Sequence, residues 1–282
     1  MSKIDKFYEA KNFFQCPKCK KKIRFHAGGL VCKKEHTFDI AAKGYVNLLQ
    51  QTKAFKGYDA AFFKSRRAFF GAGYYDHIVT EVTDTVERLF DGAEDLVVLD
   101  AGCGEGGYSA AVEASLEARG ASGQVLAFDI ATDAIKVAAG NDNVKWMIAD
   151  ITNIPVKDGV VDCILDVFTP ANYKEFNRVL KDNGYLIKVV PGSAHLQELR
   201  RAVSDQLQNK EYSNEDVTDY FEDHYELVSR VKCTKTQELS GENLDNLVRM
   251  TPLLFDVDKS RLDLSSVTEI TIEGEVLVGR KK

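Results

Sequence analysis

Four residues suited to binding a metal ion occur within the first 36 positions of this 282-residue chain. Cys16 and Cys19 form one C-x2-C knuckle, and Cys32 and His36 form a second knuckle with three residues between them. Thiolates and imidazole are preferred ligands of tetrahedral Zn²⁺, and four protein ligands leave no position for a catalytic water. The spacing therefore predicts a closed, structural Cys3His zinc site. His26 is the competing fourth ligand, but it follows no knuckle cysteine closely.

A glycine-rich loop is the second chemical signature. It follows an apolar run at 96–99 and precedes a predicted helix at 108–117. Glycines at a strand-to-helix turn let a nucleoside cofactor lie against the backbone. The loop residues assigned to cofactor binding are Gly102, Gly104, Glu105, Gly106 and Gly107. Three of these glycines also fit the G-x-G-x-x-G pattern of nicotinamide enzymes, so the loop alone leaves the cofactor open.

Acidic residues at the ends of three successive predicted strands favour S-adenosylmethionine. Asp100 precedes the first glycine, and Asp129 and Asp150 end the next two apolar runs. In this order, the three carboxylates suit the amino group, the ribose hydroxyls and the adenine amino group of the methyl donor. The predicted donor site also includes the residues that follow the last two acids, Ile130 and Ile151. Taken singly, Asp129 and Asp150 have a second interpretation, as turn-forming or helix-cap residues.

The elements that position these residues alternate between helix and strand, which predicts an α/β fold. Helices are predicted at 61–70, 76–90, 108–117, 174–180, 193–208 and 241–255, and strands at 96–99, 125–128, 144–149, 163–168, 184–190, 225–231 and 267–278. No crossover helix joins the last two strands as a parallel unit, so we expect them to be an antiparallel closing pair. This pattern predicts a Rossmann-like, seven-stranded class I SAM-dependent methyltransferase sheet with a small N-terminal zinc-binding domain. The segment 241–255 could cap the substrate cleft or pack on the sheet.

Charge divides the chain unevenly. The net charge is −6, yet residues 1–75 carry 16 basic against 5 acidic side chains, a balance of +11. Basic residues gather on or beside the knuckles: Lys18, Lys20, Lys21, Lys22, Arg24, Lys33 and Lys34. Such an excess favours contact with nucleic-acid phosphates over a merely solubilising role. We therefore divide the chain into a zinc-binding RNA-recognition module (1–40), a helical connection (41–92) and a methyltransferase domain (93–282).

Composition limits the location of the protein. Hydrophobic residues make up 44% of the chain, which is enough for a large buried core. No run has the length of a membrane span, and the N-terminus lacks the apolar segment of a secretory signal. Three of the six cysteines crowd into the knuckles and three are scattered, which favours metal ligation over disulfides. We expect a cytoplasmic protein without a membrane partner.

Several segments resemble one family, the RlmA-type (RrmA/TlrB) 23S rRNA (guanine-N1-)-methyltransferases. The most specific are the passage from the knuckles to residues 43–49 and the Pro-Gly-x-x-His-Leu passage at 191–196. Further matches lie at 66–69, 73–75, 100–106 and 250–252. The resemblance covers nearly the whole chain. It implies methylation of guanine N1 in a hairpin loop of 23S rRNA that lines the peptide exit tunnel, with zinc on the four knuckle ligands and a homodimer.

The resemblance also implies cofactor contacts that the residues alone do not reveal. These are Tyr75 and His195, in addition to the loop around Gly104 and Glu105. Without the resemblance, Tyr75 would be interpreted as a core aromatic and His195 as an ordinary residue opening a helix. Two related subtypes modify neighbouring guanines, one of them associated with macrolide resistance, and no residue here assigns the subtype.

The predicted fourth strand ends in residues that could contact the target base. Guanine N1 carries a proton at neutral pH, so methylation needs a base or a well-placed acceptor. We expect Phe168 to be a stacking platform and Asp166 to be the acceptor, with a structural strand-end acid as the alternative for Asp166. The target guanine is expected to be splayed from its unpaired loop to enter the site.

Other function classes remain open from sequence. One is a methyltransferase of another RNA or of a small molecule, or a nicotinamide-dependent oxidoreductase, that kept a zinc knuckle. Another is an RNA-binding adaptor with a vestigial cofactor site. The basic zinc module argues against a small-molecule or nicotinamide enzyme, and the intact series of Asp100, Asp129 and Asp150 argues against an adaptor.

Overall fold

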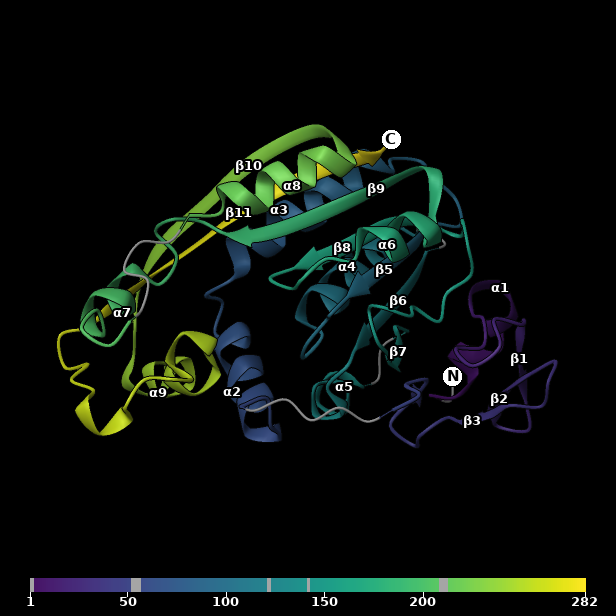
Figure 1. The fold of residues 1–282 in the computed structure, drawn as a ribbon, viewed down its shortest axis with the longest axis horizontal. Coiled ribbons are helices and arrows are strands. Elements are labelled where there is room, and N and C mark those ends of the chain that lie inside the picture. Colours follow the sequence, from purple (N-terminus) through teal and green to yellow (C-terminus); the bar gives the residue numbers. More distant parts are fainter. Residues whose placement is uncertain (1–2, 52–56, 121–122, 141–142, 208–212) are drawn as a thin grey trace.

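The computed structural model describes residues 3–51, 57–120, 123–140, 143–207 and 213–282. Within these residues, eight strands form the main sheet: β4 (Tyr45–Asn47), β5 (Val97–Ala101), β6 (Gln124–Asp129), β7 (Lys145–Ile148), β8 (Val161–Val167), β9 (Leu180–Pro191), β10 (Tyr225–Glu238) and β11 (Glu269–Lys281). Their order is β10-β11-β9-β8-β5-β6-β7-β4 (Figure 1). Neighbours from β9 to β4 pair in parallel, whereas β11 is antiparallel to both β9 and β10. The predicted antiparallel closing pair is therefore confirmed.

The sheet has one strand more than the seven predicted. The additional strand, β4, pairs in parallel with β7 at the edge, with Val46 opposite Met147. Val46 is completely buried. Three residues are too few for a periodic apolar pattern, so the sequence did not reveal this strand. It lies within the segment predicted as a helical connection, 41–92, which therefore contributes to the sheet itself.

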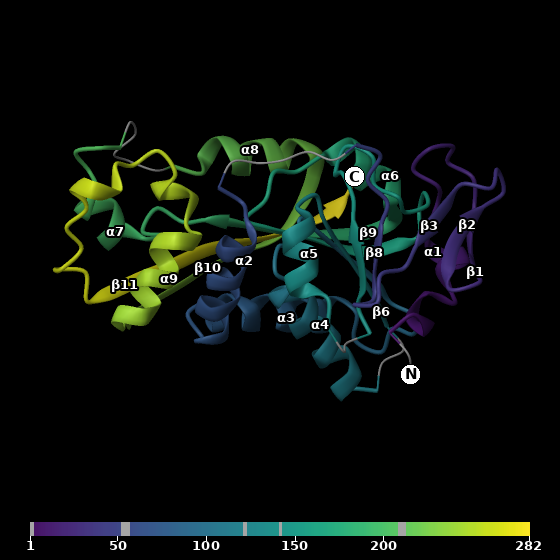
Figure 2. The ribbon, with the colours of Figure 1, turned by 90° about the horizontal axis from the view of Figure 1, so that it is seen from below.

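Alternating side chains build a separate core on each face of the sheet. Helices α3 (Asp76–Leu89), α4 (Gly107–Ala118) and α5 (Thr132–Ala138) cover one face, and α6 (Tyr173–Val179) and α8 (Glu215–His224) cover the other (Figures 1 and 2). Successive strand residues point to opposite faces. This alternation within buried strands is why the apolar runs in the sequence were nearly continuous.

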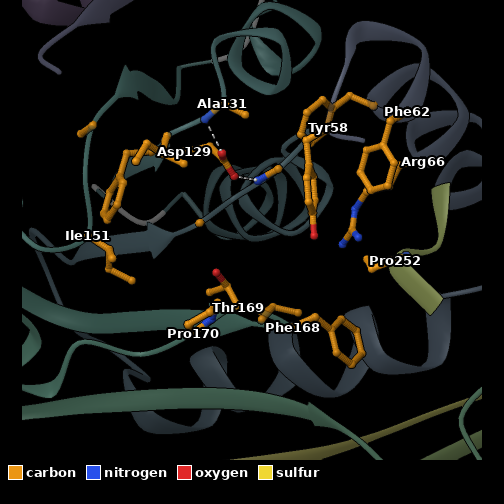
Figure 3. Close-up of a pocket in the computed structure, with 17 residues that line it drawn as sticks. Tyr58, Phe62, Arg66, Asp129, Ala131, Ile151, Phe168, Thr169, Pro170 and Pro252 are labelled. Atoms are coloured by element: carbon orange, nitrogen blue, oxygen red, sulfur yellow. Dashed lines mark hydrogen bonds between the residues drawn. The ribbon is translucent and has the colours of Figure 1, made fainter. Parts of the chain in front are cut away.

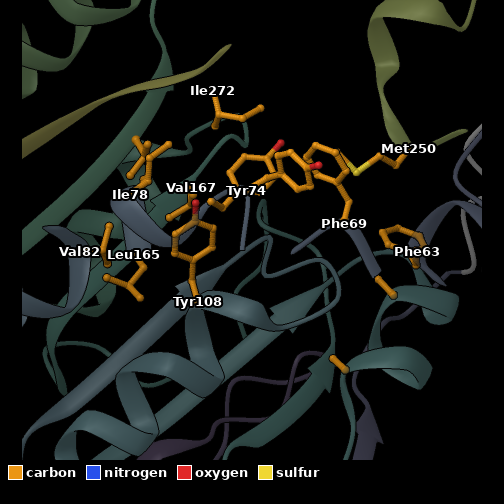
Figure 4. Packing of buried hydrophobic residues seen from close by; sticks show 14 of the residues in the cluster. Phe63, Phe69, Tyr74, Ile78, Val82, Tyr108, Leu165, Val167, Met250 and Ile272 are labelled. Carbon is orange, nitrogen blue, oxygen red and sulfur yellow. The ribbon is translucent and has the colours of Figure 1, made fainter. Parts of the chain in front are cut away.

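Two further helices pack together near the carboxyl ends of the parallel strands. They are α2 (Ala60–Gly71) and α9 (Gly241–Met250), and each contacts the other along its length. Figure 4 shows Phe69 and Tyr74 close to Met250, and the two aromatic rings stack with centroids 4.2 Å apart. The segment after α9 continues as the short 3-10 helix η2 (Pro252–Leu254). The predicted helix at 241–255 is therefore shorter than expected, and it packs on α2.

The helix predicted at 193–208 is wrong over most of its described length. Only α7 (Gln197–Ala202) is helical, and residue 208 lies outside the described residues. Leu196 adopts a left-handed φ of +55°, which interrupts a helix at this point. The preceding turn is held by Glu273, whose carboxylate accepts a hydrogen bond from the Ala194 amide at 3.0 Å. A tertiary contact from β11 therefore overrides the helical pattern.

The N-terminal module is small and docked against the second face of the sheet. It contains η1 (Asp5–Phe7), α1 (Ala10–Phe13) and the antiparallel strands β1 (Ile23–His26), β2 (Gly29–Cys32) and β3 (Thr37–Asp39). Outside this module, a short 3-10 helix, η3 (Lys259–Arg261), precedes β11. Backbone bonds join the module to the connection between β7 and β8, from the Gln15 amide to Pro155 O at 3.0 Å and from the Lys157 amide to Phe13 O at 2.9 Å. Across the described residues, no helix has the length and apolarity needed to cross a membrane.

Candidate functional site

The four knuckle residues converge on one point in the N-terminal module. The ligand atoms of Cys16, Cys19, Cys32 and His36 all lie within 4.8 Å of one another. The Cys19 and Cys32 sulfurs are 3.7 Å apart, and His36 Nδ1 lies 3.4 Å from Cys16 Sγ and 3.5 Å from Cys32 Sγ. A tetrahedron with Zn–S bonds of about 2.3 Å has S–S edges of about 3.7 Å, so the donor set and its spacing fit zinc.

The competing ligand is not part of this cluster. His26 is exposed at the end of β1, whereas His36 is half-buried beside the sulfurs. The Lys34 amide also lies 3.3 Å from Cys32 Sγ, a backbone contact that orients the thiolate. With four protein ligands already in place, the centre has a structural role.

The surface of the zinc module is strongly basic. All seven basic residues singled out beside the knuckles are exposed: Lys18, Lys20, Lys21, Lys22, Arg24, Lys33 and Lys34. The Tyr8 and Phe25 rings meet edge to face at 4.6 Å on the same module, and Tyr8 is 56% exposed. This combination of cations and aromatic rings is suited to the phosphates and bases of a nucleic acid.

A cavity of about 390 Å³ lies where the glycine loop meets the carboxyl ends of the strands (Figure 3). This volume is within the range of small-molecule and cofactor sites. Its lining comes from segments far apart in the sequence: Tyr58, Phe62, Phe63, Arg66, Gly102, Gly104, Phe128, Asp129, Ile130, Ala131, Ala149, Ile151, Val167, Phe168, Thr169, Pro170 and Pro252. Helix α2, which the sequence predicted only as part of the connection, contributes Phe62, Phe63 and Arg66 to this lining.

Asp129 marks one end of the cavity. Its carboxylate accepts hydrogen bonds from the amides of Gly104 at 2.9 Å and Ala131 at 2.8 Å. Burial raises the pKa of Asp129, while these two amides oppose the rise. Ile130 and Ile151 line the cavity beside it. A carboxylate next to two branched apolar side chains is suited to a ribose and a flat purine ring.

The glycines of the loop are required mainly by neighbouring protein side chains. A Cβ at Gly106 would overlap the Trp146 ring, and a Cβ at Gly107 would come within 2.5 Å of the Phe70 ring. Only Gly104 has open space around it, with Arg66 Nε 3.7 Å from its hypothetical Cβ. Close approach of a ligand is therefore a reason for Gly104, whereas Gly106 is required by Trp146 of β7 and Gly107 by Phe70 of α2.

The wall of the cavity beside Gly104 contains an ion pair that the sequence did not reveal. Arg66 Nε lies 2.6 Å from Glu105 Oε2, and the Glu105 side chain is only 3% exposed. Arg66 lines the cavity, and Figure 3 shows its guanidinium between Tyr58 and Pro252, facing Phe168. A possible signal was present in the sequence, because Arg66 belongs to one of the segments that carry the family resemblance.

The aromatic residues implied by the resemblance lie behind Phe168. The Phe168 ring stacks on His195 with centroids 5.6 Å apart and meets Tyr75 edge to face at 6.1 Å. Tyr75 and His195 are buried, and neither lines the cavity. Burial lowers the pKa of His195 to about 4, so the imidazole is neutral at pH 7. Phe168 itself has φ of +53°, a strained backbone of the kind that gathers at functional sites.

Two of the three strand-end acids lie outside the cavity lining. Asp100 is 2% exposed and accepts a hydrogen bond from Ser109 Oγ at 2.5 Å, and burial raises its pKa to about 7. Asp150 accepts bonds from the amide and hydroxyl of Thr152 at 2.8 and 2.6 Å. It lines a neighbouring cavity of about 210 Å³. Of the three acids, only Asp129 faces the main cavity.

Asp166 is completely buried beneath the 168–170 loop. Its Oδ2 atom lies 2.6 Å from Lys188 Nζ, which also donates to Thr169 O at 3.3 Å. Burial raises the pKa of Asp166 to about 6, and Lys188 opposes the rise. Its other oxygen, Oδ1, has no hydrogen-bond partner among the described residues. Asp166 thus supports the loop that carries Phe168, and it does not line the main cavity.

Two family descriptions match this chain. "Methyltransferase domain" matches residues 93–249, and "RlmA, N-terminal", a zinc ribbon, matches residues 14–54. Together with the sheet order and the glycine loop, these matches define a class I methyltransferase that uses S-adenosylmethionine and carries a zinc ribbon. The predicted fold class and both predicted cofactors are thereby confirmed.

Two relatives match along almost their full length. YxjB of Bacillus subtilis (strain 168), named provisionally as a 23S rRNA (guanine-N(1)-)-methyltransferase, is 32% identical over 96% of this chain and 98% of its own. The 23S rRNA (guanine(748)-N(1))-methyltransferase of Streptomyces fradiae is 29% identical over 92% of this chain and 94% of its own. The chain belongs to the RlmA-type methyltransferase family.

Solved structures show the fold alone. A chain in the complex between the Trm112 methyltransferase activator of Haloferax volcanii and a protein named provisionally as a methyltransferase has a TM-score of 0.50. It is 12% identical, and the match covers 81% of this chain and 99% of that one. The similarity supports the class I methyltransferase sheet.

Proposed function

We propose that this protein transfers the methyl group of S-adenosylmethionine to N1 of a guanine in a hairpin loop of 23S rRNA, in the region of the peptide exit tunnel. The observation that carries the proposal is the joining of two parts in one chain. One is a donor-sized cavity at the glycine loop, and the other is a zinc module with seven exposed basic side chains. The names of YxjB and of the Streptomyces fradiae relative support guanine N1 as the acceptor.

The donor is assigned to the 390 Å³ cavity. Asp129 would hold the ribose, and Ile130 and Ile151 would flank the adenine. The methionine end would then extend past Gly104 toward Phe168, with Tyr75 and His195 packed behind that ring. Asp100 supports the loop through Ser109, and Asp150 shapes the turn that presents Ile151. Gly102, Glu105, Gly106 and Gly107 complete the site.

The chain's own contribution to the reaction is placement, and the N1 proton that methylation displaces is released to water. When bound, the donor supplies an electrophilic sulfonium methyl group, so alignment of the guanine nitrogen provides much of the rate. Phe168 is the proposed platform for the guanine, because its ring lies at the cavity and is braced by Tyr75 and His195. We assign Asp166 a positioning role, since its ion pair with Lys188 reaches Thr169 O in the same loop.

The zinc module would bind the rRNA through phosphate contacts. Cys16, Cys19, Cys32 and His36 hold its knuckles together, so the basic side chains are displayed on a rigid frame. We keep the divisions at residues 40 and 92 as the proposed domain boundaries, with β4 as the part of the connection that joins the sheet. The family resemblance supports a homodimer, and the proposed rRNA substrate supports a cytoplasmic location.

Transfer of labelled methyl groups tests this function directly. We expect the purified protein to label a 23S rRNA transcript and nucleoside mapping to identify 1-methylguanosine in a hairpin loop. A matched transcript with the loop guanines replaced by adenine is expected to remain unlabelled. Label at another atom or in another RNA, or no transfer with tight nicotinamide binding instead, would refute the proposal.

A further inference from the structure

The donor-site residues predicted from sequence and from the family resemblance leave one charge of the donor unmatched. S-adenosylmethionine carries an α-carboxylate, which needs a cation or several hydrogen-bond donors when it leaves water. The predicted polar contacts are acids or neutral groups: Tyr75, Asp100, Glu105, Asp129, Asp150 and His195. His195 cannot supply the cation, because its burial keeps the imidazole neutral at pH 7. The residues predicted for the donor site therefore supply no cation for this carboxylate.

Arg66 is the one cationic side chain among the described residues that line the cavity. Neighbouring cations are engaged elsewhere in the structure. Lys188 Nζ lies 2.6 Å from Asp166, and Arg200 Nε donates to His195 O at 3.2 Å. The adjacent Arg67 is exposed and donates to Val137 O, outside this cavity. Arg66 is therefore positioned to meet an anion in the cavity.

The guanidinium of Arg66 is oriented by its own ion pair. Glu105 Oε2 lies 2.6 Å from Nε as an ion pair, although neither atom has a hydrogen-bond partner among the described residues. Figure 3 shows the guanidinium of Arg66 pointing into the cavity. A guanidinium presents five N–H donors in a planar fork and binds carboxylates through two parallel hydrogen bonds. Because Glu105 is almost completely buried, its charge holds the guanidinium of Arg66 at this place in the cavity wall.

The position of Arg66 also agrees with the proposed direction of the donor. Its charge acts on Tyr75, on Asp129 and on His195, so it lies within electrostatic reach of all three. Asp129 marks the ribose end, while Tyr75 and His195 pack behind Phe168 at the opposite end. The side chain sits over Gly104, between these two ends.

We propose that Arg66 binds the α-carboxylate of S-adenosylmethionine through its Nη groups, and that Glu105 acts on Arg66 as a positioning residue. This inference rests on the proposed location of the donor. It assigns α2 a direct role in cofactor binding, because the helix that covers the cavity also recognises the amino-acid part of the ligand.

Equilibrium binding of three ligands tests the assignment without measuring catalysis. The ligands are S-adenosylmethionine, its decarboxylated analogue, and 5′-methylthioadenosine, which lacks the whole amino-acid part. In the unaltered protein, we expect loss of the carboxylate to raise Kd by about 10- to 100-fold, the range of hydrogen bonds to charged groups. In Arg66→Gln, we expect the two sulfonium ligands to bind with Kd values within about threefold of each other.

Two controls separate this result from a general disturbance of the cavity. Methylthioadenosine is expected to bind the unaltered protein and Arg66→Gln with Kd values within about twofold of each other. This ligand has no carboxylate, so it makes no contact that the substitution would remove. Arg67→Gln removes a neighbouring arginine from the same helix and is expected to keep the full carboxylate effect. The double variant Arg66→Gln/Glu105→Gln avoids an unpaired buried acid and is expected to behave as Arg66→Gln does.

The outcomes distinguish the two levels of the proposal. A carboxylate effect of the same size in the unaltered protein and in both Arg66 variants overturns the role of Arg66 while leaving the donor cavity in place. Failure of the unaltered protein to bind either S-adenosylmethionine or methylthioadenosine overturns the location of the donor itself. If Arg66→Gln does not fold, the double variant gives the same comparison.

Discussion

The zinc centre and the donor cavity are built in opposite ways. The zinc centre takes its ligands from residues 16–36, and its ligand atoms meet because two tight knuckles bring them together. The donor cavity takes its lining from residues between 58 and 252, which meet only after the sheet and the helices around it have packed. Short-range spacing therefore specifies the first site, and long-range packing specifies the second.

The two sites also meet different electrostatic demands. The zinc centre is closed, with its protein ligands complementing one metal ion, and its basic residues are exposed around it. The donor cavity has an acid, Asp129, toward one end and an ion pair, Arg66 with the buried Glu105, beside Gly104. This difference predicts that the zinc centre can be disabled without loss of donor binding.

Removal of the zinc ligands should have the largest effect. We expect Cys16→Ser/Cys19→Ser to lose zinc, because structural zinc contributes roughly 10–16 kcal/mol to folding of such modules. Methylation of 23S rRNA should fall about 100-fold or more as the phosphate contacts lose their frame. Donor Kd should stay within about threefold, since the cavity lining contains none of the knuckle residues. Metal analysis, calorimetry and methyl transfer measure the three quantities.

A scattered cysteine provides the control for this experiment. Cys233 is half-buried in β10, away from the knuckles, so Cys233→Ser should keep both zinc and methylation. A zinc-free double variant that methylates rRNA at the unaltered rate would show that the module has no part in acceptor binding.

Two glycines of the loop at the donor cavity, Gly104 and Gly106, can be compared with each other. We expect Gly106→Ala to lower the free energy of unfolding by about 3 kcal/mol, because its Cβ would overlap Trp146 and its φ is +83°. Gly104→Ala should cost about 1 kcal/mol, since space is open there and only its φ of +55° is unfavourable. Urea unfolding measures both values. Equal losses would mean that side-chain packing does not set the requirement for glycine.

The features that the sequence could predict are those set by short-range spacing, and the features that it missed depend on long-range packing. The Cys3His cluster, the choice of His36 over His26 and the acids at the strand ends were all visible as short patterns. The sequence also predicted the antiparallel closing pair, because no crossover helix was expected to join the last two strands as a parallel unit. Strand β4 was missed, since Tyr45–Asn47 is too short for periodicity to identify.

The cavity wall formed by α2 could not be predicted for a different reason. Periodicity correctly predicts a helix at 61–70, but it does not say against which surface that helix packs. The ion pair of Arg66 with Glu105 depends on that docking. Likewise, the sequence shows Asp166 near the end of a strand, a position that also suits a catalytic acid. Only the structure shows that Asp166 pairs with Lys188 beneath the 168–170 loop.

Asp129 and Asp150 provide a second comparison within the donor site. We expect Asp129→Asn to raise donor Kd by about 10- to 30-fold, because its carboxylate faces the cavity and charged hydrogen bonds contribute about 1.5–3 kcal/mol. Asp150→Asn should raise Kd by about threefold or less, since that carboxylate is engaged by Thr152. Calorimetry with S-adenosylmethionine measures both. A larger effect at Asp150 would mean that the adenine extends into the neighbouring 210 Å³ cavity.

The smallest effect is expected from a single basic side chain of the zinc module. Lys33→Gln should weaken binding of a 23S rRNA hairpin by about fivefold at 0.1 M salt and reduce the slope of log K against log salt by about one, the value for one phosphate contact. Lys235, exposed on β10 away from the module, provides the control, and Lys235→Gln should leave the slope unchanged. Titrations at several salt concentrations measure the slopes. Because the donor cavity is untouched in both variants, donor Kd should not move. A slope that changes at Lys235 and not at Lys33 would assign the RNA-binding surface to the methyltransferase sheet, and the division between an acceptor-binding module and a donor-binding cavity would then be wrong.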